Sequence, residues 1–322
     1  MKICAACHED LPKDKFSKKQ WKLEKRRCKI CVSDNREVQP LPPSPPTNND
    51  GLANDNASND GGIDRLLESM SINEIEMISP SDEELFKLPP PKEDCPICYL
   101  RMPVSLSGYK YKSCCGKVIC SGCIHAVCTR DRGVGLCPFC RTRVHTSNNE
   151  LIKRLMKRIK VNDAWAMYNL GSCNDNGEVG LPRNHAKALE LWHRAGELGN
   201  ALAYTNIGGV YYDGLLGVGV DEEKARRYLE LAAIKGDAVA RHNLGVLEKN
   251  AGNMERALKH YMISARHGYV NSLEKIKNLF MSGYATKEDY AKALQARQVY
   301  LDEIKSDQRD KAAAFDEMYK YY

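Results

Sequence analysis

The sequence predicts a multidomain protein in which small, metal-stabilised α+β modules precede an all-α solenoid of helical repeats. Twelve of the fourteen cysteines form close pairs before residue 141, and from residue 162 onward a pattern of small residues recurs every 37 residues. A chain of 322 residues has room for roughly two or three domains. We expect segments with the bounds 1–38, 39–92, 93–146, 147–161 and 162–322.

The central segment, 93–146, holds four close cysteine pairs. Two thiolates that are separated by two residues can reach one tetrahedral cation from a tight turn, and two such pairs complete a closed zinc site. So short a segment buries too little apolar surface to fold alone, whereas structural zinc contributes on the order of 10 kcal/mol per site. The segment therefore predicts two zinc sites, made from Cys95, Cys98, Cys114, Cys115, Cys120, Cys123, Cys137 and Cys140.

The order of these pairs resembles a RING domain, and the run from Gly135 to Arg141 is similar to the all-cysteine RING of the ligase associated with the Ccr-Not complex. The resemblance implies that the first and third pairs share one ion and that the second and fourth pairs share the other. Zinc with four thiolate ligands has no open position for water, so its role is structural.

Lys117 stands where the commoner RING pattern has a histidine ligand, and a protonated lysine cannot bind a cation. Cys114 or Cys115 must then fill the vacant position. A rival ligand set uses His125 or Cys128, which otherwise lie on the helix that follows the third pair.

RING proteins hold a ubiquitin-conjugating enzyme charged with ubiquitin, and the chemistry uses the partner's cysteine. The positions that match the family's docking surface are Ile97 and Pro138, and Arg141 matches the cation that hydrogen-bonds both ubiquitin and its carrier. The other interpretation is that the turns tolerate the first two residues and that Arg141 is a solvated charge. The sequence departs from the family between Ile124 and Val127, where an aromatic residue is common and none is present.

The first segment, 1–38, predicts a third zinc site from Cys4, Cys7, Cys28 and Cys31. The run from Phe16 to Trp21 between these pairs resembles the four-cysteine finger of the Stc-one family. Clustered lysines and arginines there favour contact with a protein or with nucleic acid, or else form a solvated face.

The second segment, 39–92, is rich in Pro, Asn and Asp, so we expect a disordered linker. Within it, residues 63–78 carry an apolar stripe at helical spacing, which indicates a docking helix or an incidental nascent one.

Residues 150–160 predict an amphipathic helix with cations on its polar side. Residues 95–161 hold 13 Lys and Arg against 2 Asp and Glu. This excess favours either a nuclear-import or RNA-binding patch, or a helix that connects two domains with its cations in water. We favour the connecting helix, because an amphipathic face is first a packing face.

From residue 162 the repeats begin, and their small residues resemble those of Sel1-like repeats, which are relatives of the tetratricopeptide repeat. Ala164, Ala201 and Ala238 start successive copies, and a period of this length predicts paired helices stacked into a solenoid. We expect a fourth, degenerate copy at 270–307 and a charged tail that caps the array. The glycine-rich loop at 214–220 is expected to be an inter-helix turn, and Trp192, Leu229 and Tyr261 are expected to fill the space between helices.

An asparagine precedes the Leu-Gly or Ile-Gly dipeptide of each copy: Asn169, Asn206 and Asn243. On the concave face these side chains would bond an extended peptide. Alternatively, they satisfy carbonyl groups between helices.

The leading hypothesis is a RING-type ubiquitin ligase that binds three zinc ions, recruits a conjugating enzyme and selects a protein target through its repeats. The alternatives are a zinc-finger adaptor without ligase activity and an RNA-associated regulator that acts through the basic segments. Residues 1–15 contain no apolar signal core and no stretch is long enough to span a bilayer, so we expect no membrane contact and a cytoplasmic or nuclear location. Cys128 and Cys173 remain unpaired and are expected to be buried rather than nucleophilic.

Overall fold

The computed structural model describes residues 2–3, 10–11, 80–88, 93–131, 135–215 and 217–322. The chain divides into two units, Met1–Asp55 and Asn56–Tyr322. In the first unit, strands β1 (Lys2–Ile3) and β2 (Asp10–Leu11) pair in antiparallel fashion. The cysteines Cys4, Cys7, Cys28 and Cys31 of the predicted finger, and the predicted stripe at 63–78, lie outside the described residues.

The second unit contains the cysteine module, which we define as residues 93–146. A short 3₁₀ helix, η2 (Leu106–Gly108), leads into strand β3 (Tyr109–Lys112), which pairs antiparallel with β4 (Lys117–Cys120) before helix α5 (Ser121–Arg130). This is the predicted α+β arrangement. Among its described residues, the buried apolar side chains other than cysteine are few: Met102, Tyr109, Ile119 and Ile124.

Helix α6 (Asn148–Ile159) follows the module. Ser147 caps its start, and the Ser147 side chain accepts a hydrogen bond from the backbone N–H of Glu150. One side of α6 is buried through Ile152, Leu155 and Ile159, as the apolar pattern predicts. The helix therefore connects the module to the repeats, and its buried face is a packing face.

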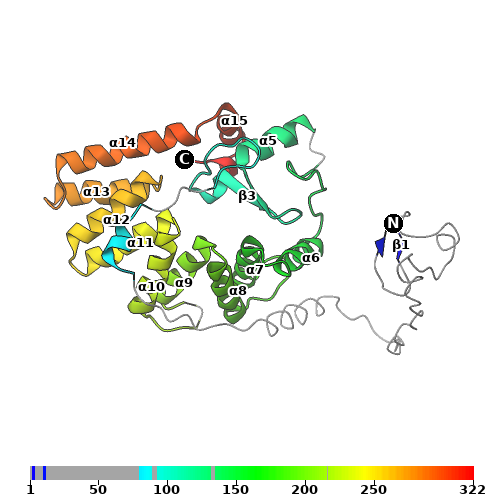
Figure 1. The fold of residues 1–322 in the computed structure, drawn as a ribbon, viewed down its shortest axis with the longest axis horizontal. Helices are drawn as coiled ribbons and strands as arrows, with labels where there is room; N and C mark the ends of the chain where they lie inside the picture. Colours follow the sequence, from blue (N-terminus) through cyan, green and yellow to red (C-terminus); the bar gives the residue numbers. More distant parts are fainter. Residues whose placement is uncertain (1, 4–9, 12–79, 89–92, 132–134, 216) are drawn as a thin grey trace. The chain divides into compact units, whose positions relative to one another are not determined.

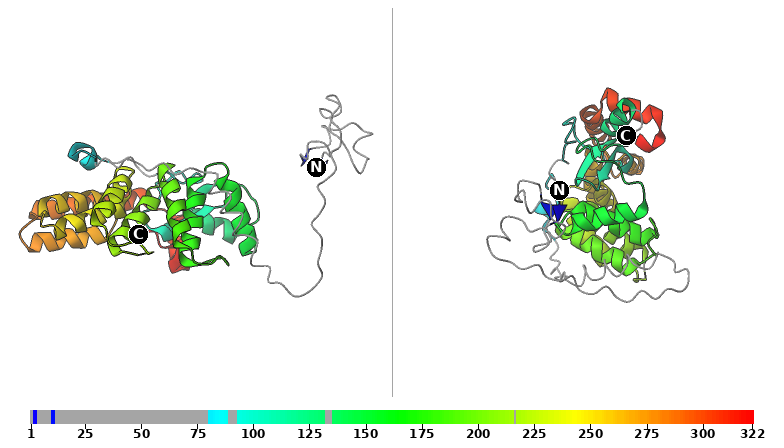
Figure 2. Two further views of the ribbon diagram at one scale, coloured as in Figure 1. Left: turned by 90° about the horizontal axis from the view of Figure 1, so that it is seen from below. Right: turned by 90° about the vertical axis from the view of Figure 1, so that its right-hand side faces the viewer.

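The repeats form antiparallel helix pairs whose members lie next to each other in sequence order (Figures 1 and 2). Asparagine or aspartate caps the first six of these helices except α12, because a short side-chain oxygen can accept the free N–H groups of the first turn. The helices are α7 (Ala164–Asn176), α8 (His185–Glu197), α9 (Ala201–Asp213), α10 (Glu222–Ile234), α11 (Ala238–Asn250), α12 (Met254–Arg266), α13 (Asn271–Met281) and α14 (Lys287–Ile304).

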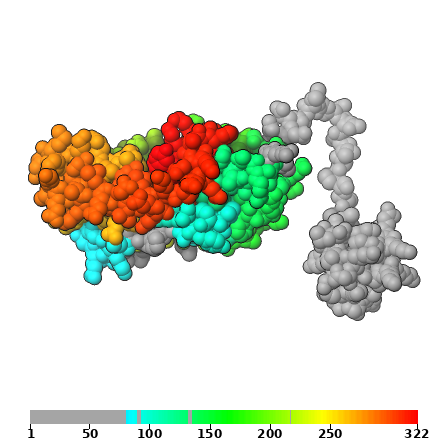
Figure 3. Space-filling model, turned by 90° about the horizontal axis from the view of Figure 1, so that it is seen from above, coloured from blue at the N-terminus to red at the C-terminus, as the bar shows by residue number. Residues whose placement is uncertain are grey.

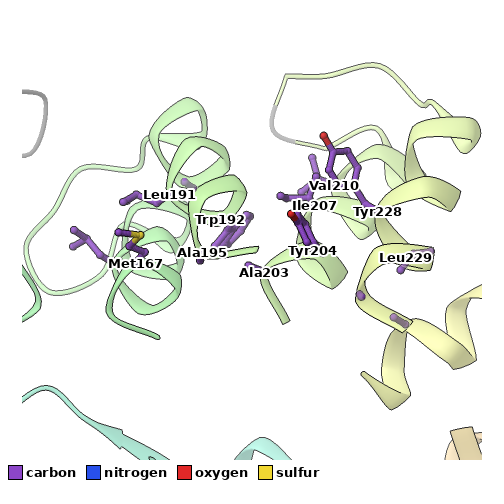
Figure 4. Close-up of a cluster of buried hydrophobic side chains, with 14 of the residues drawn as sticks. Met167, Leu191, Trp192, Ala195, Ala203, Tyr204, Ile207, Val210, Tyr228 and Leu229 are labelled. Atoms are coloured by element: carbon purple, nitrogen blue, oxygen red, sulfur yellow. The ribbon is translucent and has the colours of Figure 1, made fainter. Parts of the chain in front are cut away.

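The small residues of the repeat allow close contact between paired helices. A Cβ atom on Gly171 would lie 2.7 Å from the Trp192 ring, and one on Gly208 would lie 2.8 Å from Leu229 Cγ. Gly245 has the same relation to Tyr261, at 2.6 Å. The predicted large side chains therefore fill the space that these glycines leave, and Figure 4 shows part of the resulting core.

The C-terminal residues do not lie where the sequence predicted, as a cap on the end of the repeats. Helix α15 (Asp307–Phe315) packs against α5 of the cysteine module, and the 3₁₀ helix η3 (Glu317–Tyr319) follows it (Figure 3). The contact forms because Arg309, Phe315 and Tyr319 find partners on the module rather than on α13.

The predicted linker 39–92 also differs, because it contains helix α4 (Asp82–Phe86). Ser81 and Glu84 form a capping box at its start, and Leu85 is buried in the core of the repeats. The composition of the linker pointed to disorder, but an adjacent Leu-Phe pair is enough to anchor one turn. Among the described residues, none of the helices is both long and apolar enough to cross a membrane.

Candidate metal centres and the surfaces around them

The first and third cysteine pairs come together into one group. The Sγ atoms of Cys95 and Cys123 are 4.0 Å apart, and those of Cys98 and Cys120 are 3.8 Å apart. All four ligand atoms lie within 4.8 Å of one another.

The second and fourth pairs form the second group, in which both adjacent cysteines take part. Cys115 Sγ is 3.9 Å from Cys137 Sγ, and Cys140 Sγ is 3.4 Å from Cys114 Sγ. The turn between β3 and β4 allows this, because Gly116 adopts a left-handed conformation with φ of 73°.

The two groups fit zinc. Four thiolates at about 2.3 Å from a tetrahedral ion lie about 3.8 Å apart, close to the separations in both groups. The turns at Cys95 and Cys137 also share one geometry: the N–H of each donates to the carbonyl five residues later, at 2.9 and 2.8 Å, and the N–H four residues later donates back, at 2.9 and 3.0 Å. Such turns aim both thiols of a pair at one point. The eight predicted cysteines are thus the residues that could hold two metal ions.

The rival ligands are not part of either group in the described part of the chain. His125 lies against the rings of Phe315 and Tyr319, and Cys128 packs on the core of the module. Lys117 is exposed, with its ammonium group over the Phe139 ring. Cys173 is buried in the repeats, where burial raises the pKa of its thiol to about 11, so it is a poor nucleophile at neutral pH.

The residues predicted to dock a partner lie on the module and remain accessible. Ile97 and Pro138 are half-buried, each inside one of the two matching turns, and Arg141 is exposed. Arg141 forms an ion pair with Asp131, with Nη2 and Oδ2 2.7 Å apart. Helix α15 contacts α5 at Gly122, and with α15 in place Ile97 and Pro138 are still partly exposed and Arg141 is exposed.

Arg309 on α15 holds the first metal-binding turn, and the sequence analysis did not single it out. Its fully buried guanidinium donates to the carbonyl oxygens of Arg101 and Leu100, at 2.9 and 3.3 Å, and to that of Ile304, at 2.7 Å. The same group lies 3.9 Å from Cys98 Sγ. A cation beside a thiolate offsets the negative charge that four such ligands bring to a divalent ion.

A second contact joins the module to the first repeat through Asp163. One oxygen of this carboxylate caps α7, and the other accepts hydrogen bonds from Tyr111 Oη at 2.9 Å and from Arg158 Nε at 2.8 Å. Burial and the Asp163 carboxylate raise the pKa of Tyr111 well above its usual range, so its hydroxyl stays protonated and donates. Trp165 packs between Tyr109, Tyr111 and Tyr168 beside this contact.

A cavity of about 490 Å³ lies between the module and the loops that join the repeats. Tyr109 and Trp165 line it, together with the N-terminal ends of α9 and α11 around Asn200 and Asp237. Of the three asparagines predicted to bind a peptide, two bond groups within the repeats. Asn169 donates to the carbonyl of Trp165 on its own helix, Asn206 bonds the Tyr168 side chain, and Asn243 lines a separate cavity of about 260 Å³.

The comparisons with known proteins concern the repeats. Residues 166–200 and 201–237 match the Sel1 repeat family, so these two copies are Sel1 repeats. Chitin synthase regulatory factor 4 of Schizosaccharomyces pombe is 26% identical over 134 residues, which cover 42% of this chain and 21% of that protein. The ERAD-associated E3 ubiquitin-protein ligase component HRD3B of Arabidopsis thaliana is 36% identical over 98 residues, which cover 30% of this chain and 15% of that protein. The chain thus spans about a fifth or less of the length of these relatives.

Two solved structures are similar over a larger share of the chain. A Sel1 repeat protein from Oxalobacter formigenes covers 61% of this chain and 72% of its own, with 26% identity and a TM-score of 0.42. The protective antigen c5321 of uropathogenic Escherichia coli covers 62% of this chain and 38% of its own, with 18% identity and a TM-score of 0.42.

Proposed function

We propose that the protein is a RING-type ubiquitin ligase in which Sel1 repeats bind the target and hold the RING, here the cysteine module, in place. The observation that carries this proposal is the pairing of the cysteines: the first pair meets the third, and the second meets the fourth. Two interleaved sites of this kind make a small module rigid, because each ion ties together segments that are distant in the sequence.

The module would act by shape. Zinc in these two sites would fix the turns that carry Ile97 and Pro138, which present a partly exposed apolar surface to the conjugating enzyme. Arg141, exposed beside the second site, would bond ubiquitin and its carrier, and would exchange its pairing with Asp131 for those contacts. Transfer then uses the partner's thioester, so the chain needs no nucleophile of its own.

The repeats supply the surface for a protein partner, which is what Sel1 repeats provide in general. The name of the Arabidopsis relative, a component of a ubiquitin ligase, supports a role in the same pathway. We place the protein in the cytoplasm or the nucleus, because reduced cysteines are required for metal binding.

The test is discharge of ubiquitin from charged conjugating enzymes by the purified full-length chain. Ile97→Ala and Arg141→Ala are each expected to slow discharge at least tenfold. Leu106→Ala and Arg143→Ala replace exposed side chains of matching type on the same module and should leave the rate unchanged. If a panel of conjugating enzymes shows no stimulation by the unaltered chain, the ligase proposal is wrong.

A zinc-finger adaptor without ligase activity is the second candidate. The observation that favours it is the absence of an aromatic residue at Ile124–Val127 on α5. Nuclear magnetic resonance separates the two, because the adaptor predicts that no conjugating enzyme shifts the amide signals of residues 93–146.

The contacts that the basic helix α6 makes within the protein argue against RNA binding by this helix. Arg154 donates to the carbonyl of Arg143, and Arg158 bonds Asp163, so two of its cations already have partners within the protein. For residues 1–38, two predictions remain: contact with nucleic acid and binding of the third zinc ion.

A further inference from the structure

Helix α4 lies on the repeats as a ligand would. Leu85 is 1% exposed and belongs to their core, and the Phe86 ring lies 4.8 Å from the ring of His260 on α12. Asp82 accepts two hydrogen bonds from Arg256 Nη1, at 2.7 and 2.5 Å. We define the residues that receive α4 on helices α10 and α12 as the α4 groove.

Contacts within the repeats hold part of the α4 groove in position. Glu248, almost fully buried, accepts from Arg256 Nε at 3.2 Å and from Arg226 Nη1 at 2.6 Å, so Arg256 is held in position by the repeats themselves. The guanidinium of Arg256 and the ammonium of Lys259 also lie 5.2 and 5.9 Å from the centre of the Phe86 ring. Cations over an aromatic face attract it, so the groove favours a ring as well as a carboxylate.

The three anchors of α4 have a spacing that defines a motif. Asp82, Leu85 and Phe86 stand at positions i, i+3 and i+4, which share one face of a helix. Glu83 and Glu84 add negative charge next to the basic rim of the groove. A short helical segment with an acidic residue, a leucine and an aromatic at these positions would make the same contacts.

We propose that the α4 groove is a binding site for such a segment of a partner protein, and that α4 occupies it as an internal competitor. A helix of five residues is not stable alone, so α4 is ordered only while the groove holds it. A partner must displace a segment of the same chain, whose effective concentration at the groove is on the order of millimolar. The inference adds a partner class to the target-binding role of the repeats and does not depend on ligase activity.

The experiment titrates a fluorescent peptide of residues 80–88 with full-length protein and follows its anisotropy. Asp82→Arg places a cation opposite Arg256 and empties the groove, and the double variant Leu85→Ser, Phe86→Ser removes both apolar anchors. Both are expected to bind the peptide at least tenfold more tightly than the unaltered chain. Adding Arg256→Gln to either variant should abolish this gain, whereas Arg266→Gln, on the exposed side of the same helix, should not.

A peptide with serine in place of its leucine and phenylalanine is the second control and should not bind. If the double variant fails to fold, Asp82→Arg decides alone, because the Asp82 side chain is 69% exposed and its exchange disturbs no core. Failure of a folded, emptied variant to bind the peptide overturns the proposed site. Equal binding by the unaltered chain overturns the role of α4 as competitor. Ubiquitin discharge is scored on the same samples, so loss of one proposal is distinguished from loss of the other.

Discussion

At the scale of single residues, one buried arginine connects the end of the chain to a candidate metal centre. Arg309 pairs two carbonyl groups of the turn that carries Cys98, and it does so from a helix about two hundred residues later. The guanidinium is fully buried and donates to three carbonyl groups, so its removal breaks three hydrogen bonds. The arginine should therefore matter for both folding and metal retention.

Arg309→Met keeps the bulk of the side chain but removes its donors. A hydrogen bond from a charged group contributes about 1.5–3 kcal/mol, and the carbonyl of Leu100 keeps its bond from the N–H of Cys95, so we expect the free energy of unfolding to fall by about 2–4 kcal/mol. One metal ion should also pass to a chelator faster. Urea unfolding and the chelator rate check this. Arg130→Met, whose side chain is 66% exposed, is the control and should change the free energy by less than about 0.5 kcal/mol. If the two variants lose similar free energies of unfolding and release metal at similar rates, Arg309 does not stabilise the metal-binding turn.

The buried histidine of α12 predicts a dependence of stability on pH. Burial, together with the positive charges of Arg241, Arg256 and Arg226, lowers the pKa of His260 to about 3, and the negative charge of Glu248 opposes this shift. In the unfolded chain the ordinary pKa is about 6.5, so between these values the unfolded state binds a proton that the folded state does not. Stability is therefore lost as the pH falls through the unfolded pKa.

Between pH 7.5 and 5.5 this histidine should lower the free energy of unfolding by about 1.4 kcal/mol. Urea unfolding of the unaltered chain and of His260→Gln at both pH values measures the difference, since metal release affects both proteins alike. The unaltered chain should lose about 1.4 kcal/mol more than the variant. Equal losses would show that His260 does not titrate in this way.

At the scale of elements, the packing of paired helices requires glycine at some positions of a helix and not at others. On α9, a Cβ atom at Gly208 would meet Leu229 Cγ at 2.8 Å, whereas one at Gly209 would have nothing within 4 Å. Packing against α10 therefore requires glycine at position 208, whereas glycine at position 209 serves no packing role and lowers the stability of the helix.

Gly208→Ala and Gly209→Ala therefore form a matched pair. Overpacking typically costs about 1–3 kcal/mol, so Gly208→Ala should lower the free energy of unfolding by that amount. Gly209→Ala should raise it by up to about 1 kcal/mol, because alanine is the better helix former. Thermal unfolding monitored by circular dichroism measures both, and equal effects would contradict the packing of α9 on α10.

The repeat pattern shows how much of the fold the sequence alone could predict. The 37-residue spacing of Ala164, Ala201 and Ala238 marks the start of helices α7, α9 and α11, because packing repeats itself along the chain. The grouping of the eight cysteines followed from the RING resemblance. Arg309, the bond of Tyr111 to Asp163 and the docking of α4 were not predicted, because each joins distant segments without any local periodicity.

At the scale of the unit Asn56–Tyr322, contacts between described residues hold the cysteine module against both the first repeat and the end of the array. Asp163 and Trp165 hold it at the first repeat, and Tyr300, whose hydroxyl accepts from the N–H of Val104 at 2.7 Å, holds it near the last. With α15 on the back of α5, the module is fixed relative to the array. In the proposed ligase, a target on the repeats would then face the module at a set distance, which would favour transfer of ubiquitin to particular sites.

The central claim is that the eight cysteines of the module hold two zinc ions. Native mass spectrometry of the full-length Cys4→Ser, Cys7→Ser variant tests it most directly, because this variant lacks the predicted N-terminal site. The account predicts two zinc ions per chain and protection of the module's eight thiols from alkylation until a chelator is added. A metal-free, folded chain whose module thiols react at once, or are joined in disulfides, would contradict it.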